Sequence, residues 1–197
     1  MNTVTKLHHL NAWERTAAGG AGVVSSGISG LDELLPAGGW PRHGVVEIIV
    51  PDMLADAMGL VLPVLRRLGQ QGRMLALVTP PFEARASLYA DAEINANRVL
   101  QVNPHPGRSA LWTVESLLET GACAAVLAWP GCNTELMGKR LRKAAAAGRC
   151  LGILFRYAGL ATRRSAVDLR LRLDVTGAGR VLYRVNGNGE TLAGISI

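Results

Sequence analysis

The stretch VVEIIV at residues 45–50 is β-branched at every position except Glu47. A nearly continuous apolar run of this kind is typical of a strand that is buried on both faces of a parallel sheet. A helical spacing of apolar residues follows over 54–69, and a second apolar run, MLALVT, follows over 74–79. A strand, a helix and a strand in this order predict a βαβ unit with two parallel strands.

The same alternation continues toward the C-terminus. Because parallel neighbours need crossover connections, we expect a mostly parallel sheet with helices on both faces, which is an α/β fold of three layers (α/β/α). The apolar spacing predicts helices at 82–92, 110–120 and 134–147 and strands at 98–102, 123–129 and 150–156.

The two ends of the chain have other patterns. Apolar and basic residues alternate with period two in LRLRLDV (169–175) and RVLYRV (180–185), and TLAGISI closes the chain after the turn sequence NGNG. This pattern predicts antiparallel strands, a C-terminal hairpin, at the sheet edge. Near the N-terminus, the small residues TAAGGAG predict a flexible linker after a short helix. We expect an N-terminal helix and linker at 1–24, and one α/β domain at 25–197.

Length and composition fit a single domain with a hydrophobic core. The chain has 197 residues, of which 49% are hydrophobic and 18% are charged. A domain of this size needs neither a disulfide nor a structural metal, and its three cysteines have no CxxC spacing. The N-terminus lacks the apolar region of a secretory signal, and no stretch reaches the roughly 18 apolar residues of a membrane span. These features predict a cytoplasmic protein with no metal and no membrane contact.

Positive charge is concentrated in one part of the chain. The net charge is +6, but residues 139–184 alone contain twelve basic and two acidic residues, and 18 of the 21 basic residues are arginine. Arginine is suited to bidentate recognition of phosphate and carboxylate groups, whereas a solvated surface is the alternative explanation of a charge run. The residues that we expect to form a partner-binding or DNA-binding surface are Lys139, Arg140, Arg142, Lys143, Arg156, Arg163, Arg164, Arg170, Arg172, Arg180 and Arg184.

The strand pattern and the few aromatic residues limit what this surface could bind. Period two places Arg170 and Arg172 on one face of their strand, and Arg180 and Arg184 on one face of the next. Few aromatic residues are interleaved with these arginines, so strong or sequence-specific binding of single strands is not indicated. The pattern predicts weak, non-specific DNA contact at most, with protein partners providing the specificity.

The loop after the first predicted strand has none of the residues of a phosphate-binding P-loop. Placing GxxxxGK[ST] directly after this strand puts Val50, Ala55, Asp56 and Ala57 at the two glycines, the lysine and the hydroxyl. A carboxylate in place of the lysine repels phosphate by about 1 kcal/mol even at water-like screening. A later strand ends in Trp129 where a magnesium-binding acid would stand. The chain is therefore predicted not to be an enzyme and to hold no catalytic residue and no cofactor.

The segment SSGISGLDELLPAGGWPRHGVVEIIVP (25–51) resembles the start of the RecA recombinase core, and SAVDLRLRLDV (165–175) is similar to a late strand of that core. This resemblance implies a RecA-like three-layer sandwich. With no P-loop, and with GGWP, ALVTPP, GACAAVLAWP and LGILFR in that order, the chain resembles the ImuA family of SOS-induced translesion DNA synthesis. The ImuA resemblance implies a non-catalytic docking scaffold for a Y-family-like polymerase subunit, ImuB, and an error-prone replicative-type DNA polymerase, with RecA as a further partner.

The SulA family has similar segments and gives an alternative. LGQQGRMLALVTP (68–80), TVES (113–116) and AAAAGRCLGILFR (144–156) have SulA-like counterparts. This resemblance implies an SOS-induced cell division inhibitor that binds the tubulin-like FtsZ and blocks its polymerisation, with Arg73 as the FtsZ-binding residue. SulA proteins usually lack the leading GISGLDELLPAGGWP segment and the C-terminal hairpin, which are both present here, so the translesion interpretation is favoured.

Overall fold

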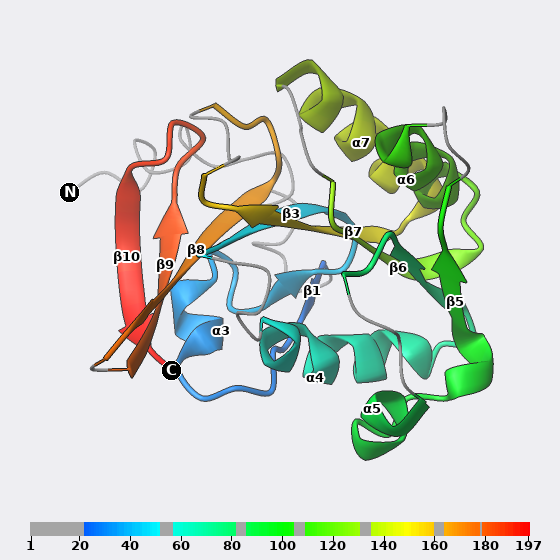
Figure 1. Ribbon diagram of the computed structural model, residues 1–197, viewed down its shortest axis with the longest axis horizontal. Helices are drawn as coiled ribbons and strands as arrows, with labels where there is room; N and C mark the ends of the chain where they lie inside the picture. The colour runs from blue at the N-terminus through cyan, green and yellow to red at the C-terminus, as the bar shows by residue number, and fades with distance from the viewer. Residues whose placement is uncertain are drawn as a thin grey trace.

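A mixed sheet of eight strands runs through the centre of the molecule in the computed structural model (Figure 1). The structure describes residues 22–51, 57–81, 86–104, 109–130, 135–159, 164–177 and 179–197, with the backbone alone for 86–88. In chain order the strands of this sheet are β3 (Gly44–Val50), β4 (Met74–Val78), β5 (Val99–Val102), β6 (Cys123–Ala128), β7 (Leu151–Tyr157), β8 (Leu169–Thr176), β9 (Gly179–Val185) and β10 (Thr191–Ser196).

The strands lie across the sheet in the order β10-β9-β8-β3-β7-β6-β4-β5. The six from β8 to β5 are parallel, while β9 and β10 are antiparallel to their neighbours. The structure thus confirms the predicted mostly parallel sheet with a C-terminal antiparallel hairpin. A separate two-stranded sheet pairs β1 (Val23–Val24) with β2 (Trp40–Pro41).

Helices lie on both sides of the sheet (Figure 1). Their bounds are α3 (Leu31–Leu34), α4 (Met58–Gly69) and α5 (Ala86–Asp91) on one side, α6 (Ala110–Glu119) and α7 (Glu135–Gly148) on the other, and a 3-10 turn, η1 (Ala96–Arg98), before β5. The long helices connect successive parallel strands, as crossover connections require. Every predicted helix of the α/β domain from 82 onward is present in this arrangement.

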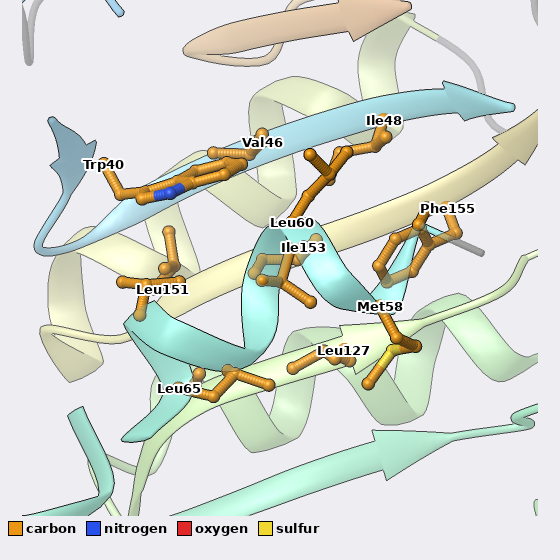
Figure 2. Close-up of a cluster of buried hydrophobic side chains, with 14 of the residues drawn as sticks. Trp40, Val46, Ile48, Met58, Leu60, Leu65, Leu127, Leu151, Ile153 and Phe155 are labelled. Carbon is orange, nitrogen blue, oxygen red and sulfur yellow. The ribbon is translucent and has the colours of Figure 1, made fainter. Parts of the chain in front are cut away.

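The core between the sheet and α4 consists of large apolar side chains. Figure 2 shows Leu60 of α4 beside Ile48 of β3 and Leu65 of α4 beside Leu127 of β6, with Trp40 of β2 at one end of this cluster. Trp40 is fully buried, and every residue of β3 is buried, as its apolar run predicts. Because each such side chain stabilises the fold by about 1.5–3 kcal/mol when buried, this layer fixes β3 as a central strand.

On the other side of the sheet, small residues let α6 and α7 approach each other closely. A Cβ on Gly148 would lie 1.9 Å from the carbonyl oxygen of Leu118 and 3.0 Å from the backbone of Glu119. A Cβ on Gly138 would lie 3.4 Å from the backbone of Ala166. The end of α7 therefore packs backbone against backbone on α6, and only glycine fits at position 148.

The predicted N-terminal helix and most of its linker lie outside the described residues. Val23 and Val24, which the prediction assigns to the linker, form β1 and pair with β2. In the described ranges between 22 and 197, no helix combines the length and the hydropathy that crossing a lipid bilayer requires.

Replacing Gly148 by alanine is expected to lower the free energy of unfolding by about 1–3 kcal/mol, because the added methyl group would overlap the backbone of α6. Urea denaturation measures this change. Gly177→Ala is the control, since no atom lies within 4 Å of a Cβ at that position. Equal stability of the Gly148→Ala and Gly177→Ala variants would contradict the close approach of the two helices.

Candidate functional site

Three of the predicted binding residues are exposed on α7. The Lys139 side chain is 61% exposed and its Nζ lies 2.9 Å from a carboxylate oxygen of Glu135, one turn earlier. Arg140 reaches across to α6, where its Nε and Nη2 donate to the two carboxylate oxygens of Glu115 at 3.0 and 2.5 Å. Lys143 is exposed and forms no ion pair with any residue that the structure describes. Lys139 and Arg140 are thus exposed but ion-paired, whereas Lys143 is exposed and unpaired within the described residues.

Arg142, a fourth predicted residue on α7, links the helix to the sheet. Its Nε donates to Oδ1 of Asp168 at 2.8 Å, and Oδ2 of Asp168 accepts from the backbone N–H of Val45 at 2.9 Å. Burial raises the pKa of the Asp168 carboxyl, and the bonds from Val45 and Arg142 offset only part of that rise. Arg142 thus holds α7 against the start of β3, with its side chain only 31% exposed.

The prediction that Arg156 and Arg170 belong to the binding surface is wrong, because both side chains are buried. Arg156 is 1% exposed and Arg170 is 4% exposed. The Nε of Arg170 lies 2.6 Å from Oε2 of Glu47, and these two residues stand opposite each other in β8 and β3. A charge in a protein interior is tolerated when it is paired. The role of Arg170 is therefore to hold β8 against β3.

The arginines of the C-terminal hairpin are divided between the two faces of the sheet. Arg172 lies 3.1 Å from Asp174 and stacks over the ring of Tyr183 at 4.8 Å. Arg180 and Arg184 share a face, as predicted, and their register places them opposite the odd-numbered residues of β8. That is the face of the leucines of β8, so Arg180 and Arg184 lie on the side of the sheet opposite Arg172.

The eleven predicted residues consequently do not form one surface. Arg163 lies outside the described residues, and Arg164 is exposed ahead of β8. Three of the eleven are exposed on the same helix, α7: Lys139, Arg140 and Lys143. Sequence periodicity correctly paired Arg170 with Arg172 and Arg180 with Arg184 on shared faces, but it carried no signal for which faces are covered.

Arg73 lies at the amino edge of the sheet and binds the backbone. Its Nε donates to the carbonyl of Gly121 at 3.0 Å, and its Nη1 donates to that of Arg149 at 2.8 Å. Its Nη2 donates to Gly148 at 2.8 Å and also to Cys123. A guanidinium has five N–H donors, so a single N–H is left for any other group. Arg73 is therefore a structural residue that joins the start of β4 to β6 and to the end of α7.

A cavity of about 280 Å³ lies beside Arg73. It is also lined by Arg42, His43 and Arg149, none of which was predicted as a site residue. These positions are far apart in the sequence, and only the sheet topology brings them together. No local motif could have identified this group.

The two cysteines of the described residues are buried thiols. Burial raises the pKa of Cys123 above its usual value, and burial raises the pKa of Cys150 to about 12. A thiol of this kind is protonated at neutral pH and is a poor nucleophile. Within the part of the chain that the structure describes, no group of three or more His, Cys, Asp and Glu residues is placed to hold a metal ion.

At the carboxyl edge of the sheet, an aromatic pair occupies the end of β6. The ring of Trp129 stacks on that of Phe155 in β7, with centroids 4.9 Å apart and planes 12° apart. This is the strand end at which a nucleotide-hydrolysing protein would carry a magnesium-binding acid. Of the positions compared with a P-loop, Ala55 and Asp56 lie outside the described residues.

A family model described as "Cell division inhibitor SulA" matches residues 45–152, which run from β3 to the start of β7. The cell division inhibitor SulA of Edwardsiella piscicida is 29% identical over 115 residues, covering 58% of this chain and 68% of that protein. SulA of Serratia marcescens is 27% identical over 116 residues, covering 58% of this chain and 69% of that protein.

Recombinases are also similar to this chain. RecA of Delftia acidovorans is 31% identical over 140 residues, covering 61% of this chain but only 38% of that protein. Among solved structures, the crystal structure of SulA from Pseudomonas aeruginosa aligns with a TM-score of 0.49 and 24% identity, covering 58% of this chain and 98% of that chain.

Removing one partner of the buried ion pair is expected to be costly. Glu47→Ala should lower the free energy of unfolding by about 3–5 kcal/mol, because Arg170 would keep a buried charge without its partner. Urea denaturation measures this loss. The double variant Glu47→Leu/Arg170→Met removes both charges and should recover most of the stability. If the double variant were as unstable as the single one, the ion pair would not be the cause.

Proposed function

Since the chain belongs to the SulA family, whose model covers residues 45–152, we propose that it is an SOS-induced inhibitor of bacterial cell division. It acts by binding the tubulin-like FtsZ and blocking its polymerisation. The observation that carries this proposal is the family match, which extends through the parallel strands from β3 to β7 and the helices α4 to α7. The SulA relatives, which match 58% of this chain, support the same conclusion.

The mechanism that we propose is binding without catalysis. An inhibitor that acts by binding occupies its partner, so the amount of inhibitor bound would limit the effect. The buried thiols of Cys123 and Cys150, with their raised pKa values, fit a protein whose cysteines serve packing. The stacked Trp129 and Phe155 at the end of β6 fit a sheet edge without magnesium chemistry.

We further propose that the core is RecA-like. The RecA relatives, which match about half or more of this chain, support this, and so does the mostly parallel sheet with helices on both sides. The match covers only 38% of RecA from Delftia acidovorans. It therefore supports a shared core, and it does not support recombinase activity for this chain.

The translesion role stays a prediction, together with ImuB, the error-prone polymerase and RecA as partners. The leading segment and the hairpin, which favour this role in the sequence, lie outside the residues that the SulA model matches. Their resemblance is to RecA, so they do not separate one RecA-like family from another. The relatives named above are division inhibitors and recombinases, and they favour the division role.

The surface that we propose for the partner is the exposed face of α7, with Lys139, Arg140 and Lys143. These side chains stand on one rigid helix whose inner face is buried. Exposed cations at an interface rim affect mainly the rate of association and its salt dependence. Arg73, the residue first expected to contact FtsZ, has four of its five N–H groups occupied by backbone carbonyls. Its effect on inhibition is therefore expected to be indirect.

Purified protein is expected to stop FtsZ polymerisation stoichiometrically. With FtsZ and GTP held constant, the polymer recovered by sedimentation should fall in proportion to the protein added and approach zero near equimolar amounts. Cells that express the chain should form filaments. Full polymerisation in the presence of excess protein would refute the proposed function.

The proposed face of α7 has its own test. Lys139→Glu/Lys143→Glu should raise the protein concentration needed for half-inhibition by about tenfold, because it reverses two exposed charges. Ala146→Glu/Ala147→Glu is the control, since both alanines are exposed on the same helix. A similar loss in the two variants would show that the charge of the helix matters in general, and that the two lysines do not mark the interface.

A further inference from the structure

The cavity beside Arg73 opens at the amino edge of the sheet. Arg42 and His43 come directly before β3, and Arg149 follows α7 just before β7. Gln71 completes the polar lining, and Leu68 and Ala124 form an apolar wall. Among the described residues, the lining thus brings three guanidinium groups and an imidazole together and includes no carboxylate.

Arg73 makes this cavity suitable for a negative charge. The carbonyls at the end of a helix carry negative partial charge, which repels an anion. The guanidinium of Arg73 binds the carbonyls of Gly148 and Arg149 at 2.8 Å each. It covers the negative end of α7, and its own positive charge is held in place by four hydrogen bonds.

The backbone of Arg149 is in a conformation that favours glycine. Its φ is 48°, and it follows the last residue of α7. The N–H of Cys150 donates to Ala145 at 3.0 Å and that of Arg149 to Ala146 at 3.4 Å, which is the Schellman arrangement at a helix end. Glycine is common at this position because it has no Cβ. An arginine there bears backbone strain and places a cation on the cavity, and strained residues of this kind cluster at functional sites.

Two of the cations have no partner among the residues that the structure describes. The side chains of Arg42 and Arg149 are exposed, and neither forms a hydrogen bond or ion pair with any residue that the structure describes. The carboxylate of Asp168 interacts electrostatically with His43, and it also accepts from Arg142 and from the backbone of Val45. The guanidinium groups of Arg42 and Arg149 are therefore not paired with a carboxylate of the described residues.

We propose that this cavity binds a small phosphate anion, inorganic phosphate or pyrophosphate. Guanidinium groups match the oxygen geometry of phosphate in a bidentate manner. The volume of about 280 Å³ lies below the roughly 300–1,000 Å³ of pockets that enclose a drug-sized ligand or cofactor. A small anion fits in such a space.

This site is separate from the place where a P-loop would bind phosphate. In open α/β sheets, ligands usually bind outside the carboxyl ends of the strands, which is the edge where β3 ends at Val50. Arg42, His43 and Arg149 precede the strands they adjoin, so they lie at the opposite edge. Binding here is independent of the division role and can be tested without FtsZ.

The experiment is a titration of the full chain with sodium pyrophosphate by calorimetry, together with thermal unfolding at constant ionic strength. At ten times the dissociation constant, pyrophosphate should raise the melting temperature by about 3–6 °C. Inorganic phosphate, with less charge, should bind more weakly. Sodium chloride of equal ionic strength should have no comparable effect.

Variants separate the cavity from general attraction of anions. Arg149→Gly should raise the dissociation constant at least tenfold while the melting temperature without ligand stays the same or rises, since glycine relieves the positive φ. Arg42→Gln should also weaken binding about tenfold. Lys143→Gln, which removes an exposed cation outside the cavity, should bind like the original chain. No binding heat, or equal losses in Lys143→Gln and Arg149→Gly, would overturn the proposal.

Discussion

The amino edge of the sheet depends on one guanidinium group. Arg73 donates hydrogen bonds to four backbone carbonyls, those of Gly121, Cys123, Gly148 and Arg149. A buried carbonyl without a donor costs about 1–3 kcal/mol, so these groups could not meet so closely without such a residue. By binding them, Arg73 fixes the start of β4 against β6 and the end of α7. It also sets one wall of the cationic cavity at this edge.

Much of the fold could be predicted, because its elements are encoded locally. The apolar run of β3 predicted a central strand correctly, and the alternation of β8 and β9 predicted which of their residues share a face. The prediction that β8 and β9 lie at the edge was wrong, because β8 pairs in parallel with β3 and the edge strand on this side is β10. The burial of Arg156 and Arg170 could not be predicted, because alternation assigns a face and does not say what covers it. Glu47, the partner of Arg170, is 123 residues away from it in the sequence, and only the β3–β8 pairing brings the two together.

The candidate site shows the same division between local and long-range information. The cations of α7 were expected at the surface from helical spacing, and Lys139, Arg140 and Lys143 lie there. Arg42 and Arg149 come together only through the order of the strands, so no motif marks them. The choice between a division role and a translesion role depended on segments at the two ends of the domain, which RecA-like families share. A partner leaves no local pattern comparable to a P-loop, and the family match to SulA is what favours the division role that we propose.

Hydrogen exchange in an Arg73→Lys variant tests most directly whether Arg73 builds this edge. Lysine keeps the charge but cannot reach four carbonyls in a planar arrangement. The account predicts that amides at 121–124 and 148–151 exchange at least about tenfold faster than in the original chain, while those of β9 and β10 are unchanged. Unchanged exchange at 121–124 and 148–151, with FtsZ inhibition lost, would mean that Arg73 acts by touching the partner, and would contradict the account.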